Sequence, residues 1–355
     1  MNVSDPWDVP REALVSPVPL IGFIGLNPDS DQSCHRNIWT LFSSNRGLDR
    51  SALNFTLLDK LELPMSKPPR TSYEWYLPRG ILKTNWMNKH LNQLPSVIVL
   101  FFTCPELPEI SAVVSKTRVA LGSRQTKLAV VLIQESVDQE MVTSVCTECS
   151  VPARAVLCLP PATSDLQPAM LEFEETLQEL ASNYYHGQIK TVKSHRDHLN
   201  KATHLQLMVR HSFKIGFFSE LKGDMNTAYK SYTSAYLLLL ESRVTEHNSC
   251  ELRAVAGIIN FKICKLAFKL NLPRDAINQF RKHLDQWRSP PSPVSLSWEQ
   301  AAWQSNQARN FANLFVEACK AGQTAIQTQH PGIKVNIFYR VSFKKVAHCL
   351  ELCIF

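Results

Sequence analysis

Four histidines lie close together in the middle of this 355-residue chain, and they are the side chains best suited to bind a metal ion. They are His195, His198, His204 and His211. On a continuous helix of about 100° per residue, His195 and His204 point to opposite sides and cannot reach one ion. His204 and His211 share a face, but no Asp, Glu or Cys beside them completes a ligand set. We therefore predict surface or interfacial histidines and no metal.

Other patterns with catalytic or ligand-binding potential are sparse. Cys146 and Cys149 form a CxxC pair, but no second pair and no nearby paired histidines accompany it, which disfavours zinc or redox chemistry. The ten cysteines are scattered without a secretory signal, as is typical of reduced thiols. No GxSxG, HExxH or kinase signature is present. The sequence therefore predicts no catalytic residue and no cofactor.

Aromatic and basic side chains are interleaved in residues 67–95. The aromatic residues are Tyr73, Trp75, Tyr76 and Trp86, and they lie among Arg70, Arg79, Lys83 and Lys89. Such a segment can stack single-stranded bases, form a protein interface, or pack a long connection against its own domain. No RNP motif, GXXG loop or zinc knuckle supports the first option. We predict a packed connection, with a protein interface as the alternative and no nucleic-acid partner.

The formal net charge of +7 is concentrated in two stretches. Residues 190–222 carry a net charge of +5, and residues 333–355 carry +3. A local basic surface can meet an acidic partner, anionic lipid headgroups or nucleic acid, and it is as often a solvated helix face. The side chains that we predict to bind a partner are Lys190, Lys193, Arg196 and Lys201.

The first 160 residues have the pattern of an α/β domain. Three continuous apolar runs are typical of strands that are buried on both faces, and segments of helical length separate them. The runs are 97–102, 128–133 and 155–159. This βαβαβ order predicts a mainly parallel sheet with flanking helices. Residues 18–26 are a candidate further strand, and residues 36–42 a helix after it.

Open parallel sheets often bind nucleotides at the carboxyl ends of their strands. The loops that follow the predicted strands at Thr103 and Gln134 contain no glycine that would let backbone amides approach a phosphate. Gly22 and Gly25 indicate a strand irregularity, and the chain has no Walker A motif. We predict that this domain binds no nucleotide.

Pro160 and Pro161 mark a boundary between domains, because consecutive prolines disfavour a helical conformation in the residues before them. From Leu166 onward nearly every segment has a helical pattern. The sequence therefore predicts an α/β domain at 1–160 and an all-α helical-repeat domain, a TPR-like α-solenoid, at 161–332. No apolar run approaches the roughly 20 residues of a membrane-spanning helix, so we expect a soluble chain.

The clearest helical repeat lies at residues 216–235. Gly216 is small where two helices must touch, and Tyr232 is large enough to fill the space beside it. Gly223 and Asp224 suit the turn between the helices, and Asp224 can cap the second one. This pattern predicts a tight helix hairpin.

Characteristic first residues indicate where two more helices begin. Pro273 suits a first helical turn, and Ser297 with Gln300 has the spacing of a capping box. Lys320 and Gly322 indicate where the latter helix ends.

The segment 333–355 has no sustained helical or strand period. We predict an atypical, poorly packed tail there. A solenoid normally ends in a polar cap, so we also expect the apolar side of the helix around residues 311–318 to be partly exposed.

Several long segments resemble the trafficking protein particle complex (TRAPP) subunit 11 family, whose helical part is known as the foie gras domain. They are residues 67–95, 194–224, 259–268, 276–287 and 322–332. The similarity runs from about residue 7 to Gly332. Family members continue into more helices and a β-rich C-terminal region called gryzun, so the resemblance suggests a truncated form that lacks this region.

The resemblance implies a function as well as a fold. Members of this family are scaffold subunits of the TRAPP III tethering complex, which works with a Rab-family GTPase in transport from endoplasmic reticulum to Golgi and in autophagy. No catalytic residues are ascribed to them. The implied partners are other TRAPP subunits, indirectly a Rab-family GTPase, and peripherally an anionic membrane surface.

The implied location is cytoplasmic, at the Golgi or the ER-Golgi intermediate compartment. A general adaptor or coat-type scaffold of the same architecture, and a nucleotide-dependent enzyme or switch, are the alternatives.

Overall fold

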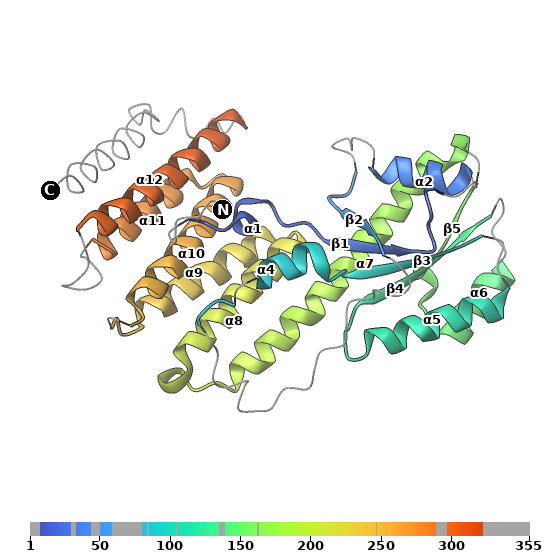
Figure 1. Cartoon of the computed structure of the whole chain (residues 1–355), viewed down its shortest axis with the longest axis horizontal. Coiled ribbons are helices and arrows are strands. Elements are labelled where there is room, and N and C mark those ends of the chain that lie inside the picture. Colours follow the sequence, from blue (N-terminus) through green and yellow to red (C-terminus); the bar gives the residue numbers. More distant parts are fainter. Residues whose placement is uncertain are drawn as a thin grey trace.

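The structure is a computed structural model, and it describes residues 8–29, 33–43, 50–58, 80–83, 85–103, 106–134, 139–161, 163–245, 247–288 and 297–321. A sheet with flanking helices occupies one end of the molecule and a stack of helices the other (Figure 1). One long helix, α7 (Thr163–Asp197), runs from the first part into the second. The predicted fold class, an α/β domain followed by a helical domain, is confirmed.

The sheet contains five parallel strands in the order β2-β1-β3-β4-β5. Their bounds are β1 Leu20–Ile24, β2 Asn54–Leu57, β3 Val97–Thr103, β4 Lys127–Ile133 and β5 Val156–Leu159. The predicted strands match β1, β3, β4 and β5 to within two residues. Strand β2 was not predicted, because it is only four residues long, lies at the sheet edge and is partly exposed.

Helices cover both faces of the sheet (Figure 1). Helix α2 (Ser33–Ser43) and the first half of α7 lie on one face, and α5 (Leu107–Leu121) and α6 (Gln139–Cys149) lie on the other. On the first face, Phe23 packs against Phe42 with ring centroids 4.8 Å apart, and Phe42 packs against Phe173 of α7 at 5.6 Å. These aromatic contacts fix α7 on the sheet.

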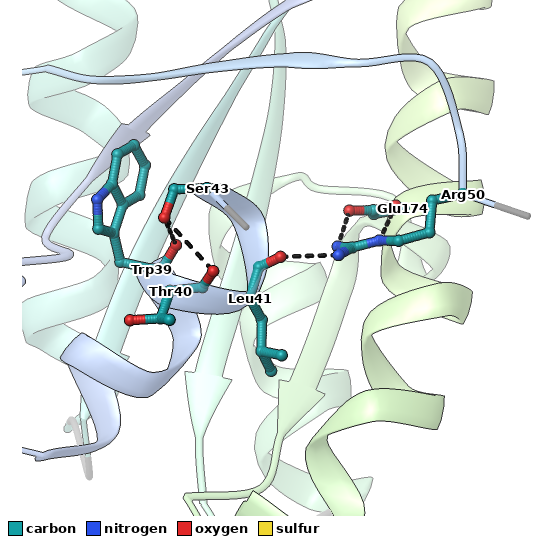
Figure 2. Close-up of polar contacts among 6 residues, drawn as sticks. All are labelled: Trp39, Thr40, Leu41, Ser43, Arg50 and Glu174. Atoms are coloured by element: carbon teal, nitrogen blue, oxygen red, sulfur yellow. Dashed lines mark hydrogen bonds and ion pairs between the residues drawn. The ribbon is translucent and has the colours of Figure 1, made fainter. Parts of the chain in front are cut away.

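An ion pair gives α7 a second attachment to this domain. Arg50, which precedes β2, forms a two-pronged contact with Glu174 of α7, with Nε donating to Oε2 at 3.2 Å. The same guanidinium donates to the Leu41 carbonyl of α2 at 2.7 Å (Figure 2). Farther along α7, Tyr185 packs against Phe218 of the next helix at 5.9 Å. Helix α7 is therefore shared by both domains, although the sequence-based boundary separates it from the sheet.

Within the described residues, the helical domain continues with five further helices. They are α8 Lys201–Lys222, α9 Met225–Leu240, α10 Ser249–Lys269, α11 Pro273–Gln286 and α12 Ser297–Lys320. We call α8 to α12 the solenoid. Helices α8 to α11 pack on one another in succession, and α12 packs on α10 and, through the stacked rings of Phe280 and Phe311, on α11 (Figure 1).

The hairpin predicted at residues 216–235 is confirmed. Gly223 has φ 88°, which lets the chain turn back after α8, and the Asp224 side chain accepts a hydrogen bond from the Thr227 amide at 3.0 Å. A Cβ at Gly216 would lie 2.8 Å from the Tyr232 ring. The missing side chain at Gly216 thus allows α8 and α9 to approach each other.

Helix α12 begins at Ser297, and the Gln300 side chain bonds to tertiary partners: its Nε2 donates to the Trp287 carbonyl at 2.9 Å, and its Oε1 accepts from Arg253. The capping box of Ser297 with Gln300 stays a prediction. One expectation about α12 is wrong. The side chains at residues 311–318 that were expected to be partly exposed are buried, because they share a cluster with α10, α11 and the N-terminal segment. Gly322 and the tail at 333–355 lie outside the described residues.

The described part of the aromatic and basic segment packs on its own chain, as predicted. Its helical elements are α4 (Trp86–Asn88) and a π-helical turn, η1 (Lys89–Gln93). Trp86 contacts Phe217 and Phe218 of α8 at centroid distances of 5.4 and 5.3 Å, and Lys214 lies over its ring. Tyr73, Trp75, Tyr76, Arg70 and Arg79 lie outside the described residues.

Candidate partner-binding surface

A buried ionic network holds three helices of the solenoid together. Lys262 of α10 lies 3.0 Å from Glu220 of α8, and Tyr232 of α9 donates its hydroxyl to the same carboxylate at 2.6 Å. The side chains of Glu220 and Lys262 are 1% and 0% exposed. Burial, reinforced by the negative Glu220, raises the pKa of Tyr232, which keeps this hydroxyl a donor. The Glu220 carboxylate therefore connects α8 to both α9 and α10.

A second buried network extends this framework to α11 and α12. The Tyr236 hydroxyl lies 2.8 Å from Nδ1 of His283 and accepts from the Trp287 indole at 3.3 Å. Burial lowers the pKa of His283 to about 3, so this ring is neutral at pH 7. The Arg253 guanidinium lies over the rings of Trp287 and Trp303. These buried contacts therefore fix how the helices that carry the surface side chains pack on one another.

The four predicted partner-binding residues lie on two helices. Lys190, Lys193 and Arg196 belong to the last turns of α7, where their three-residue spacing places them along one side. Lys190 and Lys193 are exposed and Arg196 is partly exposed. We call these three residues the α7 basic cluster. Lys201 is instead the first residue of α8.

Lys201 differs from the α7 basic cluster in its electrostatics. Its Nζ lies 2.7 Å from Glu241, which follows α9. Among the described residues, no ion pair is found for Lys190 or Lys193, and the one at Arg196 is a long contact of 3.9 Å to Asp197. Of the four predicted residues, the three of the α7 basic cluster therefore carry most of the uncompensated positive charge, and Lys201 is half of an exposed ion pair.

Two hollows flank the Lys201–Glu241 pair. The first, of about 370 Å³, is lined by one side of α9, including Tyr229, Leu237 and Glu241. The second, of about 490 Å³, lies between the start of α8 and the segment after α9, with Ala202, His204, Ser242 and Arg243 among its lining residues. Leu237 is 58% exposed. The end of the α8–α9 hairpin thus combines charge, concavity and exposed apolar area, which are features of protein-binding surfaces.

Sequence reasoning found the basic residues of this surface but missed the hollows and Leu237. One signal for Leu237 is available in the sequence. Residues 237–240 are four consecutive leucines, and a helix that buries one stripe cannot bury all of them. Leu239 is buried and Leu237 is left exposed.

The four histidines are divided between α7, the turn after it and α8, and His195 lies near His211. Helix α7 ends at Asp197, so His195 and His204 lie on different helices, and His211 is buried. The surface or interfacial position predicted for the histidines is wrong for His211. Burial, with nearby Lys214, lowers the pKa of His211 to about 4, so the ring enters the interior uncharged. Within the described ranges, no three His, Cys, Asp or Glu side chains are arranged to hold a metal ion.

The two cysteines of the CxxC pair lie on α6. Cys149 is buried and Cys146 is partly buried, and neither forms a disulfide. Burial, with nearby Glu148, raises the pKa of Cys149. A thiol with a raised pKa is a poor nucleophile and a poor metal ligand at neutral pH.

The strand order places a topological switch point between β1 and β3, where open α/β sheets commonly bind ligands. Here the Asn27 amide donates to Nδ1 of His35 at 3.1 Å, and His35 Nε2 lies 3.0 Å from the Thr103 hydroxyl. Gly25 has φ 85°, and a Cβ there would collide with the Phe101 carbonyl. The amide at the end of β1 is thus engaged within the chain. That the domain binds no nucleotide stays a prediction.

The fold is an α/β domain joined through α7 to a stack of helices. A family model described as "Foie gras liver health family 1" matches residues 248–348, which extends past Gly332. The chain is 41% identical to "Trafficking protein particle complex subunit 11" of Bos taurus and 42% identical to the same subunit of Homo sapiens and of Gallus gallus.

Each of these alignments covers 364 positions, 97% of this chain and 32% of the relative, so the chain spans about a third of the length of these relatives. The chain is therefore similar to trafficking protein particle complex subunit 11 along nearly its whole length. Among the helices in the described part of the chain, none combines the length and apolar character needed to cross a membrane.

Proposed function

We propose that this chain is a non-enzymatic scaffold that binds other subunits of a TRAPP III-type vesicle-tethering complex. The observation that carries this proposal is the similarity to complex subunits, which extends through both domains. The rigid solenoid supports it, because a stack of helices offers an extended surface on which several partners can assemble.

The finer parts of the proposal follow from the same relationship. The chain serves transport between endoplasmic reticulum and Golgi and also autophagy, and it is linked to a Rab-family GTPase through the other subunits. It works in the cytoplasm, peripherally at the Golgi or the ER-Golgi intermediate compartment. Its positive charge adds a weak attraction to anionic membrane.

The contact surface that we propose consists of the α7 basic cluster and the neighbouring end of the α8–α9 hairpin. Positive side chains at the edge of an interface accelerate association with an acidic partner, and salt weakens this effect. The exposed Leu237 and the hollow beside it supply the apolar part of the contact. The proposed partner surface is therefore acidic with an apolar protrusion.

Charge reversal tests this surface. Replacing Lys190, Lys193, Arg196 and Lys201 by Glu should lower co-purification of TRAPP subunits from cell extracts by about tenfold, with a larger effect at low than at high ionic strength. The control variant reverses four other exposed cations on α11 and α12: Arg274, Arg281, Lys282 and Lys320. It changes the net charge equally and should leave co-purification unchanged.

Two results would contradict the proposal in different ways. Normal recovery of TRAPP subunits by the first variant would show that the α7 basic cluster is only a solvated helix face. If the unaltered chain instead recovers coat proteins and no TRAPP subunit, the role as a general adaptor is favoured. Saturable, Mg²⁺-dependent binding of GTP or ATP in calorimetry would contradict the non-enzymatic assignment.

A further inference from the structure

The N-terminal segment lies across the far end of the solenoid, although almost the whole sequence separates the two. We call residues 8–16 the N-terminal strap. Its single helical turn, α1 (Arg11–Leu14), is followed by β1 only a few residues later. Figure 1 places α1 beside α10, and the contacts below confirm this position.

Polar side chains of α10 and α12 hold both ends of the N-terminal strap. At the beginning, Asn306 Nδ2 donates to the Asp8 carboxylate at 2.6 Å, and Arg309 lies 3.5 Å from the same oxygen. At the end, Lys265 donates to the Leu14 carbonyl, and Lys269 donates to the Ser16 hydroxyl at 2.9 Å. Three of these four contacts come from cationic side chains, so the site favours a ligand with a carboxylate and free carbonyl groups.

Two small apolar side chains fill the space between these polar anchors. Val9 and Ala13 are four residues apart and belong to one hydrophobic cluster with aromatic side chains of the solenoid. Those aromatic residues are Phe261 and Phe268 of α10, Phe280 of α11, and Phe311 and Phe315 of α12. Ala13 is 0% exposed, so its side chain is fully enclosed by the cluster.

The remainder of the N-terminal strap faces solvent. Leu14 and Val15 are 46% and 45% exposed, and the Arg11 side chain is exposed as well. The strap therefore contacts the solenoid as a bound peptide does, through a charged anchor, two buried side chains and a hydrogen bond to its backbone. A segment of the solenoid core would bury its larger apolar residues instead.

We propose that the surface formed by α10 and α12 is a peptide-binding site, and that the N-terminal strap occupies it in cis. Its ligand class is a short protein segment with an acidic residue, then a Val-sized residue, and an alanine one helical turn later. Because the strap is tethered through β1, its effective local concentration is high, on the order of millimolar. A partner segment of the same chemistry gains access only when the strap leaves, so the strap restricts this site.

A strap-release experiment tests the proposal in the full chain. Ala13→Asp places a charge at a buried position and should expel the strap, whereas the matched control, Val15→Asp, places the same charge at an exposed one. A fluorescently labelled synthetic peptide of residues 8–18 is titrated into each protein and followed by anisotropy. We expect saturable binding to Ala13→Asp and at least about tenfold weaker binding to Val15→Asp and to the unaltered chain.

Specificity and folding are controlled separately. A peptide carrying Asp8→Lys should bind the released site about tenfold more weakly, because Arg309 and Asn306 lose their acceptor. If Ala13→Asp does not fold, Asp8→Lys in the full chain removes the anchor at the beginning of the strap without a buried substitution. Fast hydrogen exchange of amides 9–16 in the variant would show that the strap has left. No peptide binding to a folded variant with a released strap would overturn the proposal.

Discussion

The two domains are stabilised by different kinds of interior. The strands of the sheet are apolar: all five residues of β1 are buried, as are the first six of β3. The buried ion pair of Glu174 with Arg50 lies where helix α7 packs on the sheet, not between strands. The solenoid interior contains ionised groups, most completely buried at Glu220 and Lys262. In a parallel sheet, the backbone hydrogen bonds between strands determine which strands are neighbours. Helices satisfy their backbone internally, so side chains have to specify which helices pack together, and buried ion pairs can serve this purpose.

The strongest test of this comparison removes one charge of the buried pair. Lys262→Met should lower the free energy of unfolding by about 3–5 kcal/mol, because the Glu220 carboxylate is left buried with only the Tyr232 hydroxyl. Urea denaturation followed by circular dichroism measures the loss. The double variant Glu220→Leu with Lys262→Met removes both charges and should recover most of the stability. A double variant as unstable as the single one would show that shape, and not charge, orders these helices.

Acid should destabilise the solenoid through its buried histidines. The pKa values of His211, about 4, and His283, about 3, lie below the ordinary value of 6.5, so the unfolded chain binds more protons as the pH falls below 6.5. Stability is therefore full above pH 6.5 and is lost as pH decreases toward these folded-state pKa values. Each histidine contributes roughly 1.4 kcal/mol per pH unit in this window.

Urea midpoints at pH 7.5 and pH 5.5 measure this dependence, and the two histidines together predict a loss of about 3 kcal/mol. His211→Gln should remove about half of it. The α/β domain contributes with the same sign through His35 of α2, because burial also lowers the pKa of this histidine. An equal stability at the two pH values would show that the solenoid histidines are accessible to protons in the folded chain.

Two glycine substitutions compare the cost of overpacking between helices with the gain in helix propensity, and their expected effects on stability are smaller. Gly216→Ala introduces a Cβ 2.8 Å from the Tyr232 ring, and overpacking should outweigh the gain in helix propensity by about 1–2 kcal/mol. At Gly187 of α7, the nearest group to a new Cβ is the Gln125 side chain at 3.4 Å. Gly187→Ala should therefore stabilise the chain by about 0.5–1 kcal/mol. Thermal unfolding of both variants checks the difference, and a Gly216→Ala protein as stable as the Gly187→Ala protein would refute it.

Local patterns in the sequence predicted most of the elements. The continuous Val, Ile and Leu runs located β3 and β4, since only strands covered on both faces are apolar throughout. The hairpin was equally predictable, because Gly223 and Asp224 impose their conformations within a few residues. The positive charge of Lys190 and Lys193 was also evident, and their exposure agrees with it.

The tertiary structure alone decided which distant groups meet. Gln300 has the spacing of a capping residue, but Arg253 and the Trp287 carbonyl are its partners. The sequence pattern groups Lys201 with the other basic residues, but in the structure Lys201 forms an ion pair with Glu241.

The burial of residues 311–318 involves the N-terminal strap, nearly 300 residues away in sequence, where Asp8 contacts Asn306. The sequence by itself determined the type of each element and which side chains are apolar or charged, because these depend on local spacing. It could not determine the partners, because packing and ion pairing depend on distances that are set only when the whole chain has folded.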